Sequence, residues 1–231
     1  MNKTKIDWAD YTWNPQVGCK CNCTKETAGF DCYAKQINDR FKMIPNWNEP
    51  VWFMERLKDL EKKITIPKQR NPIAQLISPD KPIIFVGSMC DLFGKWNSQK
   101  DIDAVMNANV ERQDVVFMFL TKNVSRYVEC LNAVGYFNCV FGATITNKSQ
   151  DDTLAFLETI NEFEKTFLSI EPIMSDFTGV DFTGIDFIIV GADTSKNPVI
   201  PKREWIESIN HPRIYYKQNI LKYFPDLKNN Y

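Results

Sequence analysis

The sequence has no apolar run approaching the roughly 18 residues that a membrane-spanning helix needs, so we expect no membrane partner. The amino-terminal stretch MNKTKIDWADYTWNP contains no uninterrupted apolar core, which argues against a secretory signal. Neither an internal repeat nor a low-complexity tract is present. The formal net charge is −1, so no overall field draws the chain to nucleic acid or to an anionic membrane. These absences favour one folded, cytoplasmic domain over residues 1–231.

Short apolar runs rich in Val, Ile and Phe recur through most of the chain, and most of them do not alternate with polar residues. Such runs are typical of parallel strands that are buried on both faces. We expect strands at Ile83–Ser88, Val115–Thr121, Cys139–Ile145, Thr166–Ile170, Phe187–Gly191 and Arg213–Lys217. Strand starts lie roughly 20–35 residues apart, which is the size of a βα unit. The pattern therefore predicts an α/β fold, a partial TIM-like (βα)6 barrel with parallel strands.

Helical patterns lie between most of the expected strands. Ser98 and Ser149 are expected to cap two helices. Apolar residues at helical spacing predict two more, which begin near Val124 and Trp205. The segment from Tyr33 to about Lys63 is also expected to be helical. A basic stretch at 58–70 follows, and we interpret it as a solvated helix end and loop in preference to a nucleic-acid contact.

The cysteines are unevenly distributed. The chain has seven, an odd number, and four of them (Cys19, Cys21, Cys23 and Cys32) fall in one short polar segment. In a reducing compartment this pattern argues against a disulfide framework and for a metal site. Thiolates select iron–sulfur clusters, zinc or copper(I). Four thiolates would suit structural zinc, whereas three would leave one iron of a cluster open, and spacing alone does not decide between them.

Several motifs in this chain resemble a phage and bacterial family of unknown function that is related to the radical S-adenosylmethionine (SAM) superfamily and distantly to spore photoproduct lyases. The resemblance begins with Thr12-Trp13-Asn14-Pro15-x-x-Gly18-Cys19 and Cys32-Tyr33-Ala34. It continues in order through Ser88–Phe93, Leu120–Lys122, Ser169–Pro172, Val190–Ala192 and Tyr216–Gln218 and so covers most of the chain. The superfamily's usual Cys-x3-Cys-x2-Cys pattern is altered, because eight residues separate Cys23 from Cys32. Cys23 keeps the first spacing and is the expected middle ligand, with Cys21 as the alternative.

The resemblance implies a [4Fe-4S] cluster on three cysteines, with its fourth iron binding SAM. An electron from the cluster would cleave SAM to a 5′-deoxyadenosyl radical, which takes a hydrogen atom from the substrate. It further implies an electron donor such as flavodoxin or ferredoxin, a nucleic-acid or nucleotide substrate, and the host cytoplasm as the location if the gene is carried by a phage.

Polar residues follow the predicted strands, where active sites of βα barrels lie. By resemblance, the expected SAM contacts are Ser88, Thr144 and Glu171, with Tyr33 near the adenine. The expected catalytic, substrate-side residues are Asp91, Lys122, Asp193 and Lys217.

Two other hypotheses stay open. Carboxylates at the strand ends could act as a general acid and base in a barrel hydrolase whose cysteine segment is a structural zinc loop. Alternatively, the chain could be a non-catalytic phage interaction protein with a cysteine-bound metal, because fold alone does not establish catalysis.

Overall fold

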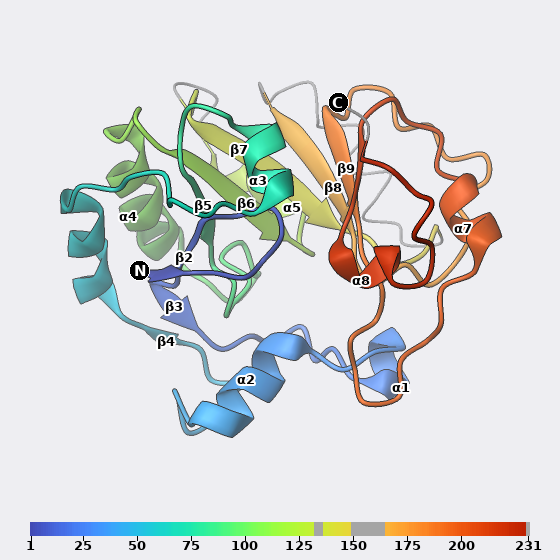
Figure 1. Ribbon diagram of the computed structural model, residues 1–231. Coiled ribbons are helices and arrows are strands. Elements are labelled where there is room, and N and C mark those ends of the chain that lie inside the picture. Colours follow the sequence, from blue (N-terminus) through green and yellow to red (C-terminus); the bar gives the residue numbers. More distant parts are fainter. Residues whose placement is uncertain (132–135, 149–164, 230–231) are drawn as a thin grey trace.

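The computed structural model describes residues 1–131, 136–148 and 165–229 (Figure 1). Among these residues, no helix is both long enough and apolar enough to cross a membrane. The strands are β1 (Asn2–Lys3), β2 (Tyr11–Trp13), β3 (Gln16–Val17), β4 (Val51–Trp52), β5 (Ile83–Val86), β6 (Val116–Thr121), β7 (Cys139–Thr144), β8 (Thr166–Ile170), β9 (Phe187–Val190) and β10 (Ile214–Tyr216). The helices are α1 (Lys25–Ala28), α2 (Tyr33–Phe41), the 3-10 helix η1 (Met54–Glu61), α3 (Pro72–Ile77), α4 (Gln99–Val110), α5 (Ser125–Cys130), α7 (Arg203–Glu207) and α8 (Gln218–Leu221).

The centre of the molecule is an eight-stranded sheet in the order β1-β2-β5-β6-β7-β8-β9-β10. The pairing of β1 with β2 is antiparallel, whereas every pairing from β2 to β10 is parallel. All six predicted strands are present, and β2 adds one more parallel strand. In the described ranges no pairing joins β10 to the first strands, so the sheet is open at its edges. A mixed α/β fold with a mostly parallel sheet is thus confirmed, and closure into a TIM-like barrel is not observed.

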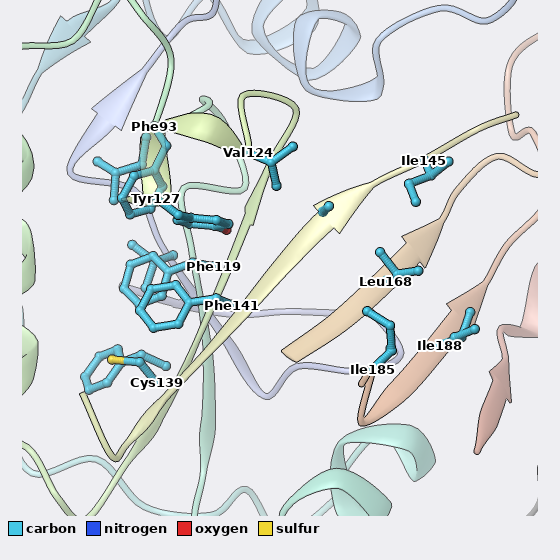
Figure 2. Packing of buried hydrophobic residues seen from close by; sticks show 14 of the residues in the cluster. Phe93, Phe119, Val124, Tyr127, Cys139, Phe141, Ile145, Leu168, Ile185 and Ile188 are labelled. Atoms are coloured by element: carbon cyan, nitrogen blue, oxygen red, sulfur yellow. The ribbon is translucent and has the colours of Figure 1, made fainter. Parts of the chain in front are cut away.

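Both faces of this sheet are buried, which explains the unbroken apolar runs. Along β5, Ile84 and Val86 join the core on one face, and Ile83 and Phe85 join a second core on the other. Figure 2 shows residues of the first core, where aromatic rings gather on one side of the view. These rings belong to Phe93, Phe119, Tyr127 and Phe141, with centroids 4.6–6.0 Å apart.

The second core is covered by the amino-terminal loop and by α3. Trp8 packs on Phe85 with ring centroids 4.5 Å apart, and Ile73 and Ala74 of α3 complete the layer. The carboxyl ends of parallel strands lie at one edge of the sheet. The polar residues that follow these strands therefore lie close together, next to the second core.

The expected helices are confirmed in part. Ser98 caps α4 by accepting a hydrogen bond from the Asp101 amide, and α5 and α7 form where the spacing predicts them. The continuous helix expected from Tyr33 to Lys63 is wrong: α2 ends at Phe41, β4 intervenes and η1 follows. Pro45 and Pro50 lie in the break and disfavour helix there. The helix expected after Ser149 lies outside the described residues.

The basic stretch at 58–70 contributes less surface charge than its sequence suggests. The Arg70 side chain is only 6% exposed, and its guanidinium donates to both carboxylate oxygens of Asp10 at 2.8–3.0 Å. It also donates to the carbonyls of Ser78, Pro79 and Lys81. Asp10 in turn accepts from the Ile83 amide at 2.8 Å. Arg70 therefore joins the loop before β5 to the start of β2.

Candidate functional site

The cysteine segment is fixed where it leaves β3. Gly18 has a φ of +105°, and a Cβ there would come within 2.8–2.9 Å of the Trp47 carbonyl and Pro50. Only glycine fits this approach without strain. The Gly18 amide donates to Met89 O at 2.9 Å, and the Cys19 amide donates to Trp47 O at 3.0 Å. The first cysteine is thereby held against the loop that follows β5.

The long gap between Cys23 and Cys32 is folded into the short helix α1. Thr24 caps this helix by accepting from the Thr27 amide, and Gly29 ends it in the left-handed conformation at φ +79°. The chain then turns back, and the Cys32 amide donates to Cys23 O at 3.3 Å. The eight residues between these two cysteines therefore form an excursion that returns Cys32 to the neighbourhood of Cys23.

One cavity of about 330 Å³ lies at the carboxyl ends of the strands. Its volume is within the range of small-molecule sites. The floor is formed by Trp8, Phe85 and Leu120 of the second core. The wall contains all the site residues that the sequence analysis selected: Cys19, Cys21, Cys23, Cys32, Tyr33, Ser88, Asp91, Lys122, Thr144, Glu171, Asp193 and Lys217.

The thiols in this wall influence one another electrostatically. Burial raises the pKa of Cys23 to about 11, with smaller contributions from Cys21 and Cys32, while Lys122 acts to lower it. The pKa of Cys21 is raised first by its hydrogen bond with Cys19, then by burial and by the Asp91 carboxylate. All four of these cysteines line the same cavity.

Whether the residues fit a metal depends on donors and on geometry. The donors fit, because several cysteines around a largely apolar cavity are the ligands that an iron–sulfur cluster takes. Over residues 1–131, 136–148 and 165–229, however, no three His, Cys, Asp or Glu side chains are arranged closely enough to hold a metal ion. The cysteine segment would therefore have to draw together on binding.

Asp91 is the most heavily engaged polar residue of the cavity. Its carboxylate accepts from Thr121 Oγ1 at 2.6 Å, from the Lys122 amide at 3.0 Å and from Asn123 Nδ2 at 2.9 Å. The thiol of Cys21 donates to the same group at 3.7 Å. Asp91 thus joins the end of β5 to the end of β6 and to the cysteine segment. These contacts describe a positioning residue, and the catalytic role expected for Asp91 stays a prediction.

The other carboxylates of the cavity also have partners. Glu171 accepts from Lys217 Nζ at 2.6 Å and from Ser169 Oγ at 3.2 Å. Burial acts to lower the pKa of Lys217, but attraction by Glu171 outweighs it, so this pKa is raised. Asp193 accepts from the amides of Ser195 and Val199 at 2.8 and 3.0 Å and thereby shapes the loop after β9.

Lys122 differs from Lys217. Its ammonium lies 5.6 Å from the Phe30 ring centre, and no carboxylate partner is found for it in the described part of the chain. Lys122 is therefore the cavity cation best placed to meet an anionic group.

Two of the expected SAM contacts are bonded to the protein. Ser88 Oγ donates to Asn14 Oδ1 at 3.2 Å, and the Tyr33 hydroxyl donates to Ser88 O at 2.7 Å. Asn14 also accepts from the Met89 amide at 3.0 Å. The Asn14 side chain thus ties the end of β2 to the loop after β5, next to the cavity. Thr144 reaches the wall from the end of β7.

Sequence reasoning missed some residues of the wall. Cys90, a fifth cavity thiol, directly follows the β5 turn; burial raises its pKa, as does Asp91 to a lesser extent. Its position after a buried strand was a signal that could have identified it. Phe30 and Trp8 also line the cavity, and no sequence signal distinguished them from ordinary core aromatics.

Comparison with known proteins identifies a family but not an activity. No curated protein and no solved structure gives a significant match to the chain. Residues 3–219 match the family described as "Protein of unknown function (DUF5131)". That match includes the cysteine segment and every wall residue of the cavity. The chain therefore belongs to the DUF5131 family.

Proposed function

We propose that this protein is a radical SAM enzyme with a partial-barrel architecture, and that its cavity holds a [4Fe-4S] cluster and SAM. When bound, the cluster supplies the electron that breaks a carbon–sulfur bond of the SAM sulfonium. The observation that carries the proposal is the return of the chain after α1, which brings Cys32 to Cys23 in a cavity that four cysteines and the strand-end polar residues share.

The chain's own residues have distinct tasks in this proposal. Cys19, Cys23 and Cys32 would hold the cluster, since Cys21 is occupied by Asp91. Glu171 is suited to the amino group of SAM, because it already holds one ammonium group at 2.6 Å. The apolar floor below them excludes water from the reacting atoms.

The substrate proposed from the family resemblance is a nucleotide or nucleic acid. The lysines in the stretch at 58–70 are compatible with this, although Arg70 is not available. A nucleic-acid substrate should bind weakly, with an affinity that falls steeply as salt rises. Filter binding of a short single-stranded oligonucleotide at 50 and 200 mM salt would measure this, and affinity that does not respond to salt would contradict it.

The first test is iron content. We expect anaerobically reconstituted protein to bind about four irons and four sulfides and to absorb broadly near 400 nm. Changing Cys19, Cys23 or Cys32 to alanine should abolish this, while Cys130→Ala, at a buried cysteine of α5, should not. Retention of full iron by all three variants would refute the ligand assignment, and colourless protein with tightly bound zinc would refute the cluster.

The second test is chemistry. With dithionite as reductant, the reconstituted protein should convert SAM to 5′-deoxyadenosine and methionine. Glu171→Gln should weaken SAM binding in calorimetry, because it removes the charge that attracts the amino group. An unchanged affinity for SAM would refute the assignment of Glu171 as a SAM contact.

A further inference from the structure

Helix α2 carries an apolar stripe that no part of the described chain covers. Tyr33, Ile37 and Phe41 lie at i, i+4 and i+8, so they share one face of the helix. They are 47%, 37% and 64% exposed, and Met43 extends the stripe at 38%. Ala34 and Asn38 occupy the adjoining face, which is buried. Figure 1 shows α2 at the lower edge of the molecule, apart from the sheet.

The same helix carries positive charge. Lys35 forms an ion pair with Asp39 at 2.8 Å. The remaining positive charges of this segment are those of Arg40 and Lys42. Neither of these two has a carboxylate partner among the residues that the structure describes. The Arg40 guanidinium lies 5.1 Å from the centre of the Phe41 ring. Exposed aromatic and Met side chains with arginine are the composition of a protein-binding surface.

The position of this surface indicates which partner it fits. Cys32 occupies the position just before the first residue of α2, and Tyr33 is both the first residue of the stripe and part of the cavity lining. Phe41 is nine residues after Cys32, roughly 14 Å along the helix. A protein docked here would therefore lie directly beside the thiols of the cavity.

We propose that the face formed by Tyr33, Ile37, Arg40, Phe41, Lys42 and Met43 docks a small acidic protein that delivers one electron to the cavity. The inference rests on the proposed function, because an iron–sulfur centre that cleaves SAM consumes one electron in each cleavage. The unpaired cations complement an acidic surface and would accelerate encounter. Electron-transfer complexes bury little surface, below about 1,200 Å², so a single helical face is sufficient. The overall charge of −1 gives no comparable reason to expect nucleic acid here.

The test uses reduced flavodoxin as the probe and the reconstituted full chain as acceptor. The double variant R40E/F41D should slow flavodoxin oxidation, followed by stopped-flow absorbance, at least tenfold at low salt. It should also lose binding to flavodoxin in calorimetry. Reduction by dithionite, and the 5′-deoxyadenosine formed with it, should equal those of the unmodified protein, because dithionite needs no docking surface.

The matched control is K81E/F137D. Phe137 is 63% exposed, like Phe41, but it precedes β7 and so lies at the end of the sheet opposite the cavity. Equal flavodoxin kinetics for the two double variants would overturn the docking proposal while leaving the proposed function intact. Dimerisation in sedimentation that only R40E/F41D abolishes, with no change in flavodoxin kinetics, would assign the face to a second copy and also overturn it. Failure of dithionite to reduce even the unmodified protein would overturn the proposed function and this inference with it.

Discussion

Replacing Asp91 with alanine should destabilise the protein even when no cofactor is present. The carboxylate is only 5% exposed and accepts three hydrogen bonds of 2.6–3.0 Å from residues 121–123. Hydrogen bonds to a charged group contribute roughly 1.5–3 kcal/mol each, and two of the donors can reach water in the variant, so we expect a loss of about 3 kcal/mol. For a chain of this size that corresponds to a fall in Tm of roughly 6–12 °C. The Tm of Asp91→Asn should lie between those of the unmodified protein and Asp91→Ala. The asparagine keeps one oxygen that accepts from Thr121, but its NH2 group would face the NH2 donor of Asn123.

The assay is thermal unfolding of the cofactor-free protein followed by circular dichroism, with Asp80→Ala as the control. Asp80 is an exposed aspartate just before β5, without a hydrogen-bonded partner in the described chain. A Tm for Asp91→Ala within about 2 °C of the control would refute the positioning role. The catalytic role expected for Asp91 would then be the remaining explanation for its place in the cavity wall.

Three further predictions concern the sheet and the loops that lead into it. Gly142→Ala should lower stability by roughly 1–3 kcal/mol in urea unfolding, because the new Cβ would lie 2.2 Å from the Phe167 ring. Unchanged stability would mean that this ring moves freely. Arg70→Met should cost about 3–5 kcal/mol, since it leaves the Asp10 carboxylate buried without its cation; amide exchange should then accelerate first in β2 and β5. Burial raises the pKa of Cys139 to about 12, so iodoacetamide at pH 8 should modify it only after unfolding in urea, as mass spectrometry would show.

The strands could be predicted because burial on both faces of a parallel sheet requires apolar residues at every position. Ile83–Val86 and Phe187–Val190 satisfy this without interruption. β2 escaped prediction because Tyr11–Trp13 is only three residues long, and only its pairing with β5 makes it a strand. The residues of β2 themselves give no indication that they will pair with β5, which lies far away in the sequence.

The candidate site was predictable for a related reason. Parallel strands bring their carboxyl ends to one edge, so residues such as Thr144 and Asp193 meet without any sequence motif that relates them. The position of Cys32 was harder to foresee. Its return to Cys23 depends on the cap at Thr24 and the left-handed turn at Gly29, and these act through the backbone. Cysteine spacing alone therefore could not identify the neighbouring thiols.

The arrangement of carboxylates also separates the competing hypotheses. A general acid needs a carboxyl group that can hold and release a proton near the substrate. Asp91 accepts three hydrogen bonds, Glu171 is paired with Lys217, and Asp193 is bonded to the amides of its own loop. All three carboxylates are therefore already engaged as hydrogen-bond acceptors within the protein.

A structural zinc loop meets a similar difficulty. Such a loop surrounds its metal with four ligands and needs no cavity beside it. Here Cys19, Cys21, Cys23 and Cys32 line a cavity of about 330 Å³ with an apolar floor, which leaves room for a second molecule next to the sulfurs. The proposed arrangement, in which three cysteines hold a cluster and the cavity holds its small-molecule ligand, would account for both features. If SAM failed to bind the reconstituted protein in calorimetry, the cavity would lose its assigned occupant.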